Sequence, residues 1–151
     1  MCNHCNPNFV FSGYGCSKIA CKYFDALELK LCIKIQHKHL DKQQKQWVGV
    51  EHRPTAWPRK GVDGYYMDTC PIAIEFLGDY YHGHPRFWGL DGEECDKWDR
   101  KFKDLFTDTG TKLAKLKSLG YKVYYVWESD FTKNPEDVVG ARREFIDKLE
   151  T

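Results

Sequence analysis

A carboxylate inside a short apolar run is the sequence feature that most constrains how this chain can fold. Residues 72–77 read IAIEFL, so Glu75 lies in a segment apolar enough to form a buried strand. Burying an unpaired carboxylate costs several kcal/mol or more, so the folded chain must supply a partner for Glu75. A metal ion is one such partner, and a salt bridge at a sheet edge is another.

A second acid, Asp63, precedes this run in the segment GVDGYYMD. We expect strands at residues 61–68 and 72–77, joined by a tight turn, with Asp63 and Glu75 at the same end of the sheet. Two carboxylates on neighbouring strands, together with water and a phosphate oxygen, make the oxygen site that Mg²⁺ or Mn²⁺ prefers. In the alternative interpretation, Asp63 only belongs to a turn and Glu75 forms a salt bridge.

The charges of the chain are unevenly distributed, although its net charge is only +1. Residues 17–60 contain ten Lys and Arg against four acids, and residues 97–122 contain eight against three. Residues 62–96 contain one Arg against eight acids. An acidic centre between two basic arms suits a metal site that faces a polyanion such as DNA. Solvated faces of Lys-rich helices would also explain the arms, but not the acidic centre.

The length of 151 residues suits one domain with a full core, and 42% of the residues are hydrophobic. No apolar run is long enough to span a membrane, and we expect no membrane partner. No signal peptide follows Met1, and the seven cysteines are an odd number, so we expect a reducing intracellular setting, in the cytoplasm or nucleus. We expect an N-terminal extension at 1–16 and one domain at 17–151.

The extension begins with a Cys-x-x-Cys motif, which is a common half of a tetrahedral zinc site. The four cysteines that would form a structural Zn²⁺ site are Cys2, Cys5, Cys16 and Cys21. In the alternative interpretation these residues are free thiols.

Hydrophobic spacing and turn signals predict an α/β domain in which helices flank a small mixed sheet. Ser17 suits an N-cap position, and Gly120 suits the end of a long helix. The expected elements are helix 17–33, strand 47–51, strands 61–68 and 72–77, helix 96–119, strand 121–127 and a last helix from Pro135. Residues 38–46 and 78–92 are expected to be loops.

Three blocks together resemble those of a known group: GVDGYY, IEFLGDYYHGHP and LKSLGYKVYYVWESDF. They are similar to the PD-(D/E)XK nuclease superfamily, in the branch of the very short patch repair endonucleases. Related nuclease domains of large DNA viruses, phages and homing endonucleases share this branch. The resemblance covers about residues 17–131. It implies a restriction-endonuclease-like core that cleaves DNA with Mg²⁺ in repair, recombination or the processing of viral or mobile DNA, as a monomer or homodimer.

The resemblance also implies roles for individual residues. Asp63 and Glu75 match the metal-binding acids of the family, and His82 matches a histidine that acts near the scissile phosphate. Glu51 falls near an upstream acid of the viral relatives. An acid such as Glu28 is often supplied by the N-terminal helix.

Two departures from the family pattern qualify this comparison. Leu77 occupies the position of the motif Lys, and His82 or Lys112 are the candidates to replace it. The patch-repair enzymes also carry zinc-ligand cysteines after the histidine segment, whereas only Cys95 follows here.

The residue chemistry suggests how the remaining polar groups would act. His82 would be a general acid or base, and Asp79 would orient His82 or hold a second metal ion. The rings after Tyr80 would stack on bases or simply pack in the core. The expected DNA contacts are Arg59, Lys60, His84, Arg86, Trp88, Lys112 and Lys115.

Two alternatives remain open at this stage. One is a DNA-binding module on a nuclease fold that has lost its chemistry, which Leu77 favours. The other is an HNH-type zinc nuclease built on the CNHC motif, His37 and His39, which the long helix after Ser17 disfavours.

Overall fold

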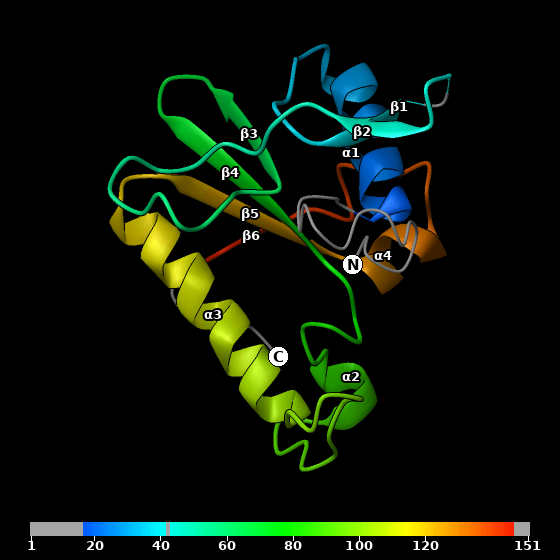
Figure 1. Cartoon of the computed structure of the whole chain (residues 1–151), viewed down its shortest axis with the longest axis vertical. Helices are drawn as coiled ribbons and strands as arrows, with labels where there is room; N and C mark the ends of the chain where they lie inside the picture. The colour runs from blue at the N-terminus through cyan, green and yellow to red at the C-terminus, as the bar shows by residue number, and fades with distance from the viewer. Residues whose placement is uncertain (1–16, 42, 147–151) are drawn as a thin grey trace.

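Strand β4 (Pro71–Leu77) is the centre of the protein in a computed structural model that describes residues 17–41 and 43–146. It lies between β3 (Gly64–Met67), its antiparallel partner, and β5 (Lys122–Trp127), which runs parallel to it. The short strand β6 (Arg143–Glu144) completes a mixed four-stranded sheet in the order β3-β4-β5-β6. The expected α/β class with a small mixed sheet between helices is therefore confirmed (Figure 1).

The helices cover the two faces of this sheet. Helix α1 (Lys18–Leu31) and α4 (Glu128–Lys133) pack at one side, and α3 (Phe102–Ser118) runs along the other (Figure 1). A hairpin of β1 (His39–Asp41) and β2 (Gln46–Val48) lies beside α1, and the single-turn helix α2 (Pro85–Trp88) lies near the start of α3. No helix within residues 17–41 and 43–146 has the length and apolarity needed to cross a bilayer.

Alternation along β4 divides the core into two clusters. Ile72, Ile74 and Phe76 pack with α1, whereas Ala73 and Leu77 pack with α3. Successive strand residues point to opposite faces, so Glu75 also faces α3. This alternation determines which helix can supply a partner to the buried carboxylate.

Local sequence explains the bounds of the two long helices. Ser17 caps α1, because its Oγ accepts a hydrogen bond from the backbone N–H of Ala20 at 3.1 Å. Helix α3 begins at Phe102, later than the expected residue 96. The Asp96 side chain accepts from the backbone N–H groups of Trp98 and Arg100 and binds the Arg100 guanidinium, so these residues form a turn.

The expected last helix from Pro135 is wrong. Residues 135–142 form turns, in which Asp137 Oδ1 accepts from Gly140 N–H at 2.9 Å, and β6 follows. Val138 packs in the cluster under α1, whereas Phe145 packs in the cluster under α3. A chain that crosses the sheet edge buries apolar side chains in both clusters, which one amphipathic helix could not do.

Smaller differences concern three other segments. Residues 39–41 form a strand rather than a loop, and the second strand of that hairpin ends at Val48, so Glu51 lies beyond it. Within the expected loop 78–92, four residues form α2. Farther along the chain, residues 128–133 form α4 directly after β5.

Candidate active site

Asp63 and Glu75 lie opposite one another where β3 begins. Gly64 pairs with Ile74, so the same register places Asp63 across from Glu75. The backbone N–H of Asp63 lies 3.3 Å from Glu75 Oε1, and Asp63 Oδ2 accepts from the backbone N–H of Phe76 at 2.9 Å. The Asp63 side chain therefore extends the strand pairing by one bond and is held beside the Glu75 carboxylate.

Helix α3 supplies the partner that the buried carboxylate requires. Glu75 is 2% exposed, and Lys112 Nζ donates to its Oε2 at 2.7 Å. Lys112 thus reaches the acid pair from α3, whereas the position of the motif Lys on β4 holds the buried Leu77. A lysine in this position neutralises the buried carboxylate and also places a cation beside the acid pair.

The charges of this group are strongly coupled. Burial, and then the nearby Asp63 carboxylate, raise the pKa of Glu75 to about 7, although Lys112 opposes this rise. Burial lowers the pKa of Lys112, but the carboxylates of Glu75 and Asp63 outweigh this effect and the net change is upward. Burial and the charge of Asp63 also raise the pKa of Glu51. A site that combines close carboxylates with raised pKa values favours a bound cation.

His82 lies near Lys112 and is held by α3. Its Nδ1 lies 2.8 Å from Thr109 Oγ1, and the Thr109 hydroxyl donates to the backbone carbonyl of Leu105 at 2.9 Å. Since that hydroxyl proton is already used, Nδ1–H donates to Thr109 and Nε2 carries the lone pair. Burial, and then the positive charge of Lys112, lower the pKa of His82 to about 4. The imidazole is therefore neutral at pH 7.

A cavity of about 320 Å³ brings these groups together with further cations. Its polar lining includes Lys60, Glu75, Tyr81, His82, Arg100 and Lys112. A concave site with neutral imidazole, carboxylate, ammonium and guanidinium groups can hold a phosphodiester and move a proton.

The structure gives other expected site residues local structural contacts. Asp79 Oδ1 accepts from Ser129 Oγ at 3.0 Å, so Asp79 binds α4 rather than His82. His84 is the N-cap of α2, and its ring lies 4.1 Å from that of Trp127. Trp88 stacks on Phe102, with the ring centroids 4.0 Å apart.

The expected basic contacts are spread over several elements. Arg59 and Lys60 lie on the exposed loop before β3, Arg86 lies on α2, and Lys115 lies on the exposed side of α3. Only Lys60 and Lys112 of the expected set line the cavity.

Of the cysteines expected to bind zinc, Cys2, Cys5 and Cys16 lie outside the described residues. Cys21 is buried in α1, and its Sγ lies 3.5 Å from the backbone carbonyl of Lys38.

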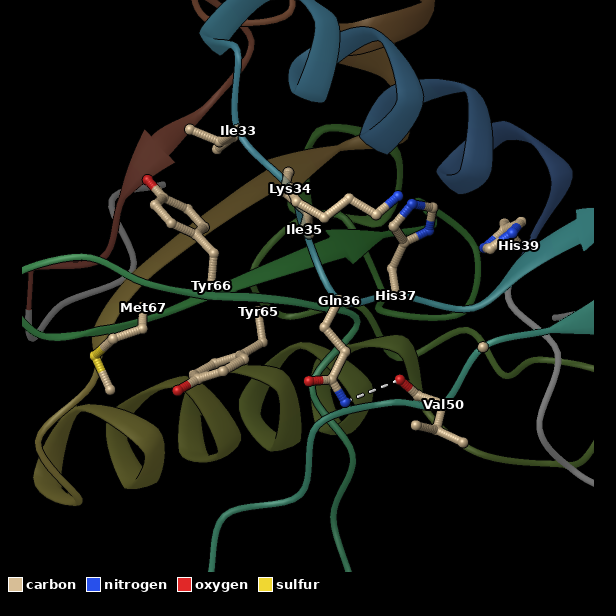
Figure 2. A pocket seen from close by; sticks show the side chains of 11 residues that line it. Ile33, Lys34, Ile35, Gln36, His37, His39, Val50, Tyr65, Tyr66 and Met67 are labelled. Atoms are coloured by element: carbon tan, nitrogen blue, oxygen red, sulfur yellow. Dashed lines mark hydrogen bonds between the residues drawn. The ribbon is translucent and has the colours of Figure 1, made fainter.

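A larger cavity of about 670 Å³ lies elsewhere, along β3 and the segment that precedes β1 (Figure 2). The Gln36 side chain donates to the backbone carbonyl of Val50 at 3.2 Å, and the Tyr65 and Tyr66 side chains also line this cavity (Figure 2). Its lining carries no acid, so it lacks the chemistry found around Glu75.

Comparison of the chain with protein-family models, with curated proteins and with solved structures finds no match.

Sequence reasoning missed Thr109 and Arg100. Thr109 precedes Lys112 by three positions, so the two residues share one face of a helix, and this spacing was a usable signal. Arg100 had no comparable signal, because its position depends on the turn formed around Asp96.

Proposed function

We propose that this protein is a metal-dependent DNA endonuclease that hydrolyses phosphodiester bonds. The observation that carries the proposal is the meeting of Asp63, Glu75 and Lys112 beside a neutral His82, around a cavity lined by further cations. The resemblance to the PD-(D/E)XK nucleases supports the same assignment, with Lys112 of α3 in place of the lysine that Leu77 replaces.

The donor set of the site fits Mg²⁺ or Mn²⁺. Asp63 and Glu75 offer carboxylate oxygens from neighbouring strands, and such oxygens are the ligands that these hard cations prefer. Burial, and then the charge of the neighbouring Asp63 carboxylate, raise the pKa of Glu75, and a divalent cation would offset both effects. When bound, such an ion would lower the pKa of a water and polarise a phosphoryl oxygen.

The side chains around the acids have distinct roles in this proposal. Lys112, charged at neutral pH, stabilises negative charge that develops on the phosphate. His82 accepts a proton at Nε2, because Nδ1–H is bound to Thr109 and the ring is neutral. Thr109 is a positioning residue that fixes the tautomer of His82 through its bond to Leu105.

DNA would approach over the exposed residues of the cavity rim. Lys60 and Arg100 are both exposed, and both line the cavity that Glu75 also lines. Contacts of this kind neutralise phosphates, so binding is expected to weaken steeply with salt.

The test is cleavage of supercoiled plasmid DNA in Mg²⁺, Mn²⁺ or EDTA by the wild-type protein and by Glu75→Gln. Glu136→Gln is the matched control, because Glu136 is an exposed acid in the turn after α4. We expect nicked or linear product that requires metal and is lost in Glu75→Gln but retained in Glu136→Gln.

Two results would contradict the proposal. Cleavage by Glu75→Gln at the wild-type rate would exclude Glu75 as a metal ligand. DNA binding without cleavage, on mismatched, branched, single-stranded and duplex substrates in both metals, would favour the inactive binding module, with the Glu75–Lys112 pair as a structural salt bridge.

A further inference from the structure

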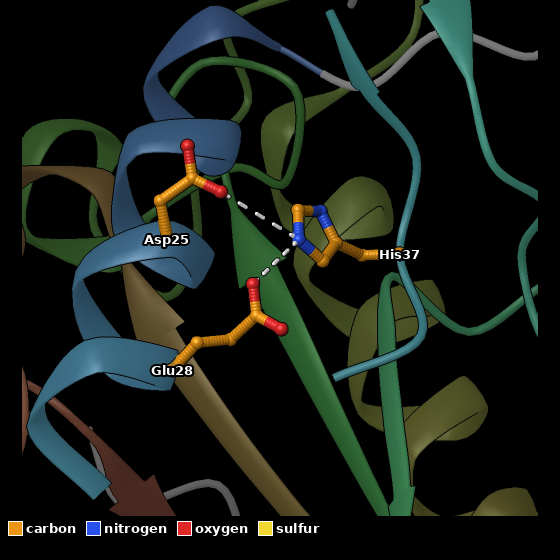
Figure 3. A group of neighbouring side chains, drawn as sticks. All are labelled: Asp25, Glu28 and His37. Atoms are coloured by element: carbon orange, nitrogen blue, oxygen red, sulfur yellow. Dashed lines mark hydrogen bonds and ion pairs between the residues drawn. The ribbon is translucent and has the colours of Figure 1, made fainter. Parts of the chain in front are cut away.

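A second group of side chains, separate from the acids around Lys112, has the composition of a metal site. Asp25 and Glu28 project from α1 toward the ring of His37, which belongs to the segment that leads into β1 (Figure 3). One ligand atom from each of these residues lies within 4.8 Å of the other two. The nuclease proposal does not use any of these side chains.

The hydrogen bonds of His37 determine which nitrogen faces the acids. Nδ1 lies 3.0 Å from the backbone carbonyl of Lys38, which can only accept, so Nδ1 carries a proton. Nε2 faces Glu28 Oε1 at 3.4 Å and Asp25 Oδ1 at 3.8 Å. A lone pair on Nε2 would point at two carboxylates, so a positive centre between the three side chains would stabilise this arrangement.

The distances favour a metal ion over a proton as that centre. A charge-assisted N–H···O bond would be about 2.8 Å long, shorter than either contact. Ligands bound to Zn²⁺ at about 2.0 to 2.1 Å in a tetrahedron lie about 3.3 Å from one another. The separation of 3.4 Å between His37 Nε2 and Glu28 Oε1 is close to that value, whereas Asp25 Oδ1, on an exposed side chain, lies farther away at 3.8 Å from Nε2.

The surroundings hold two of the three ligands in place. Glu28 Oε2 accepts from the backbone N–H of Ile35 at 2.9 Å and pairs with Lys34 at 3.3 Å, which leaves Oε1 directed at His37. The ring of His37 is 5% exposed and packs against Phe24, with centroids 5.1 Å apart. A ligating histidine whose other nitrogen binds a carbonyl is the usual arrangement in metal sites.

We propose that Asp25, Glu28 and His37 bind a divalent transition-metal ion such as Zn²⁺, with water in the remaining coordination position. One imidazole and two carboxylates suit such an ion better than Mg²⁺ or Ca²⁺, which prefer oxygen ligands alone. The ion joins α1 to the segment before β1 and thereby stabilises the packing of the hairpin on the helix.

The test is calorimetric titration of the full chain with Zn²⁺, comparing the wild-type protein with Asp25→Asn. Asp25 is exposed, so this variant is expected to fold, and Asp104→Asn, at an exposed position in α3, is the matched control. We expect one Zn²⁺ equivalent to bind at least tenfold more weakly in Asp25→Asn and unchanged in Asp104→Asn. Identical isotherms for wild type and Asp25→Asn would overturn the proposal.

Two further measurements separate this site from other metal-binding groups. In a titration with Co²⁺ in place of Zn²⁺, an ion bound by the N-terminal cysteines would show an intense thiolate charge-transfer absorption. An ion bound by Asp25, Glu28 and His37 has only oxygen and nitrogen ligands, so the Co²⁺ equivalent that Asp25→Asn loses must lack this absorption. The same equivalent must persist in Glu75→Gln, which disables the nuclease site. If NMR shows the His37 ring protonated at both nitrogens and unchanged by Zn²⁺, the positive centre is a proton and the proposal fails.

Discussion

Lys112 Nζ lies 2.7 Å from Glu75 Oε2, although 37 positions separate the two residues in sequence. The contact exists because alternation along β4 turns Glu75 toward α3, while Lys112 lies on the face of that helix that covers the sheet. It joins the most buried carboxylate of the candidate site to a cation on the neighbouring helix. Both the stability and the chemistry of the site depend on this pair.

The first prediction concerns the stability of the Glu75–Lys112 pair. Lys112→Met leaves a buried acid without its partner and should lower the free energy of unfolding by about 3 kcal/mol or more at pH 8. Glu75→Gln/Lys112→Met should recover part of this loss, because no buried charge remains. Chemical denaturation of both single variants, the double variant and the exposed control Lys30→Met measures the coupling. Additive effects would show that the two side chains do not interact.

The pH dependence of Lys112→Met has a definite sign. The folded-state pKa of Glu75 is already raised, and loss of Lys112 raises it further. The folded variant then holds a proton on Glu75 that the unfolded chain releases near pH 4.5. The free energy of unfolding therefore falls as the pH rises from 4.5 to the folded-state pKa of Glu75. The difference in stability between the wild-type protein and the variant should therefore be larger at pH 8 than at pH 5. A difference that does not change with pH would contradict this account.

The second prediction separates the two roles of Asp63. Its Oδ2 accepts from Phe76 N–H and is also proposed to bind metal. Asp63→Asn keeps a carbonyl oxygen for Phe76 and should cost less than about 1 kcal/mol, whereas Asp63→Ala should cost about 1 to 2 kcal/mol. Both variants should lose metal-dependent plasmid cleavage. Thermal unfolding and the nicking assay, performed together, test whether stability and cleavage separate in this way.

Sequence patterns predicted the parts of the fold whose signals are local. The Ser17 cap and the apolar spacing after it correctly predicted α1, and the apolar runs correctly predicted β4 and β5. The segment after Pro135 was mistaken for a helix because Val138 and Phe145 fit helical spacing, while they pack in different clusters. The cluster in which each side chain packs depends on where the chain crosses the sheet edge. That crossing is set by tertiary packing, and no local sequence pattern indicates it.

The candidate site shows the same division between local and long-range information. The strand pattern placed Asp63 and Glu75 side by side, and Lys112 was a candidate from its chemistry. Asp79 was predicted to orient His82 or to hold a second metal ion, but the hydrogen-bond partner of His82 is Thr109, which lies 27 positions away. Helical spacing could place Thr109 on the same face as Lys112, but the contact with His82 depends on the packing of α3 against the loop after β4.

The third prediction concerns acid stability. The pKa of His82 is lowered from 6.5 to about 4, so the unfolded chain binds a proton more readily in this window. Stability that is present above pH 6.5 should therefore be lost as the pH falls toward 4. One pKa unit corresponds to about 1.4 kcal/mol, and since the ring is partly exposed we expect His82 to account for about 2 kcal/mol. In His82→Asn this part of the acid destabilisation should disappear. The check is the free energy of unfolding, measured by urea denaturation at several pH values between 4 and 6.5. An equal change of this free energy with pH in the wild-type protein and in His82→Asn would contradict the prediction.

The last prediction concerns Gly83, which holds His82 against α3. Gly83 has a φ of +62°, and a Cβ there would collide with the backbone carbonyl oxygen of Phe102. Gly89 has a φ of +71° with no atom near the corresponding position. Gly89→Ala should therefore cost only the backbone strain, about 1 kcal/mol, whereas Gly83→Ala should cost about 1 to 3 kcal/mol more because the start of α3 must move.

The same pair of variants connects packing to the proposed chemistry. A displacement of α3 at Phe102 would separate His82 from Thr109, so Gly83→Ala should lower plasmid cleavage even at temperatures where it remains folded. Gly89→Ala should cleave at the wild-type rate, because its strain is confined to the end of α2. The measurements are thermal unfolding and nicking rates for both variants. Equal losses of stability and cleavage in Gly83→Ala and Gly89→Ala would contradict this prediction, because the contact with Phe102 would then have no effect of its own.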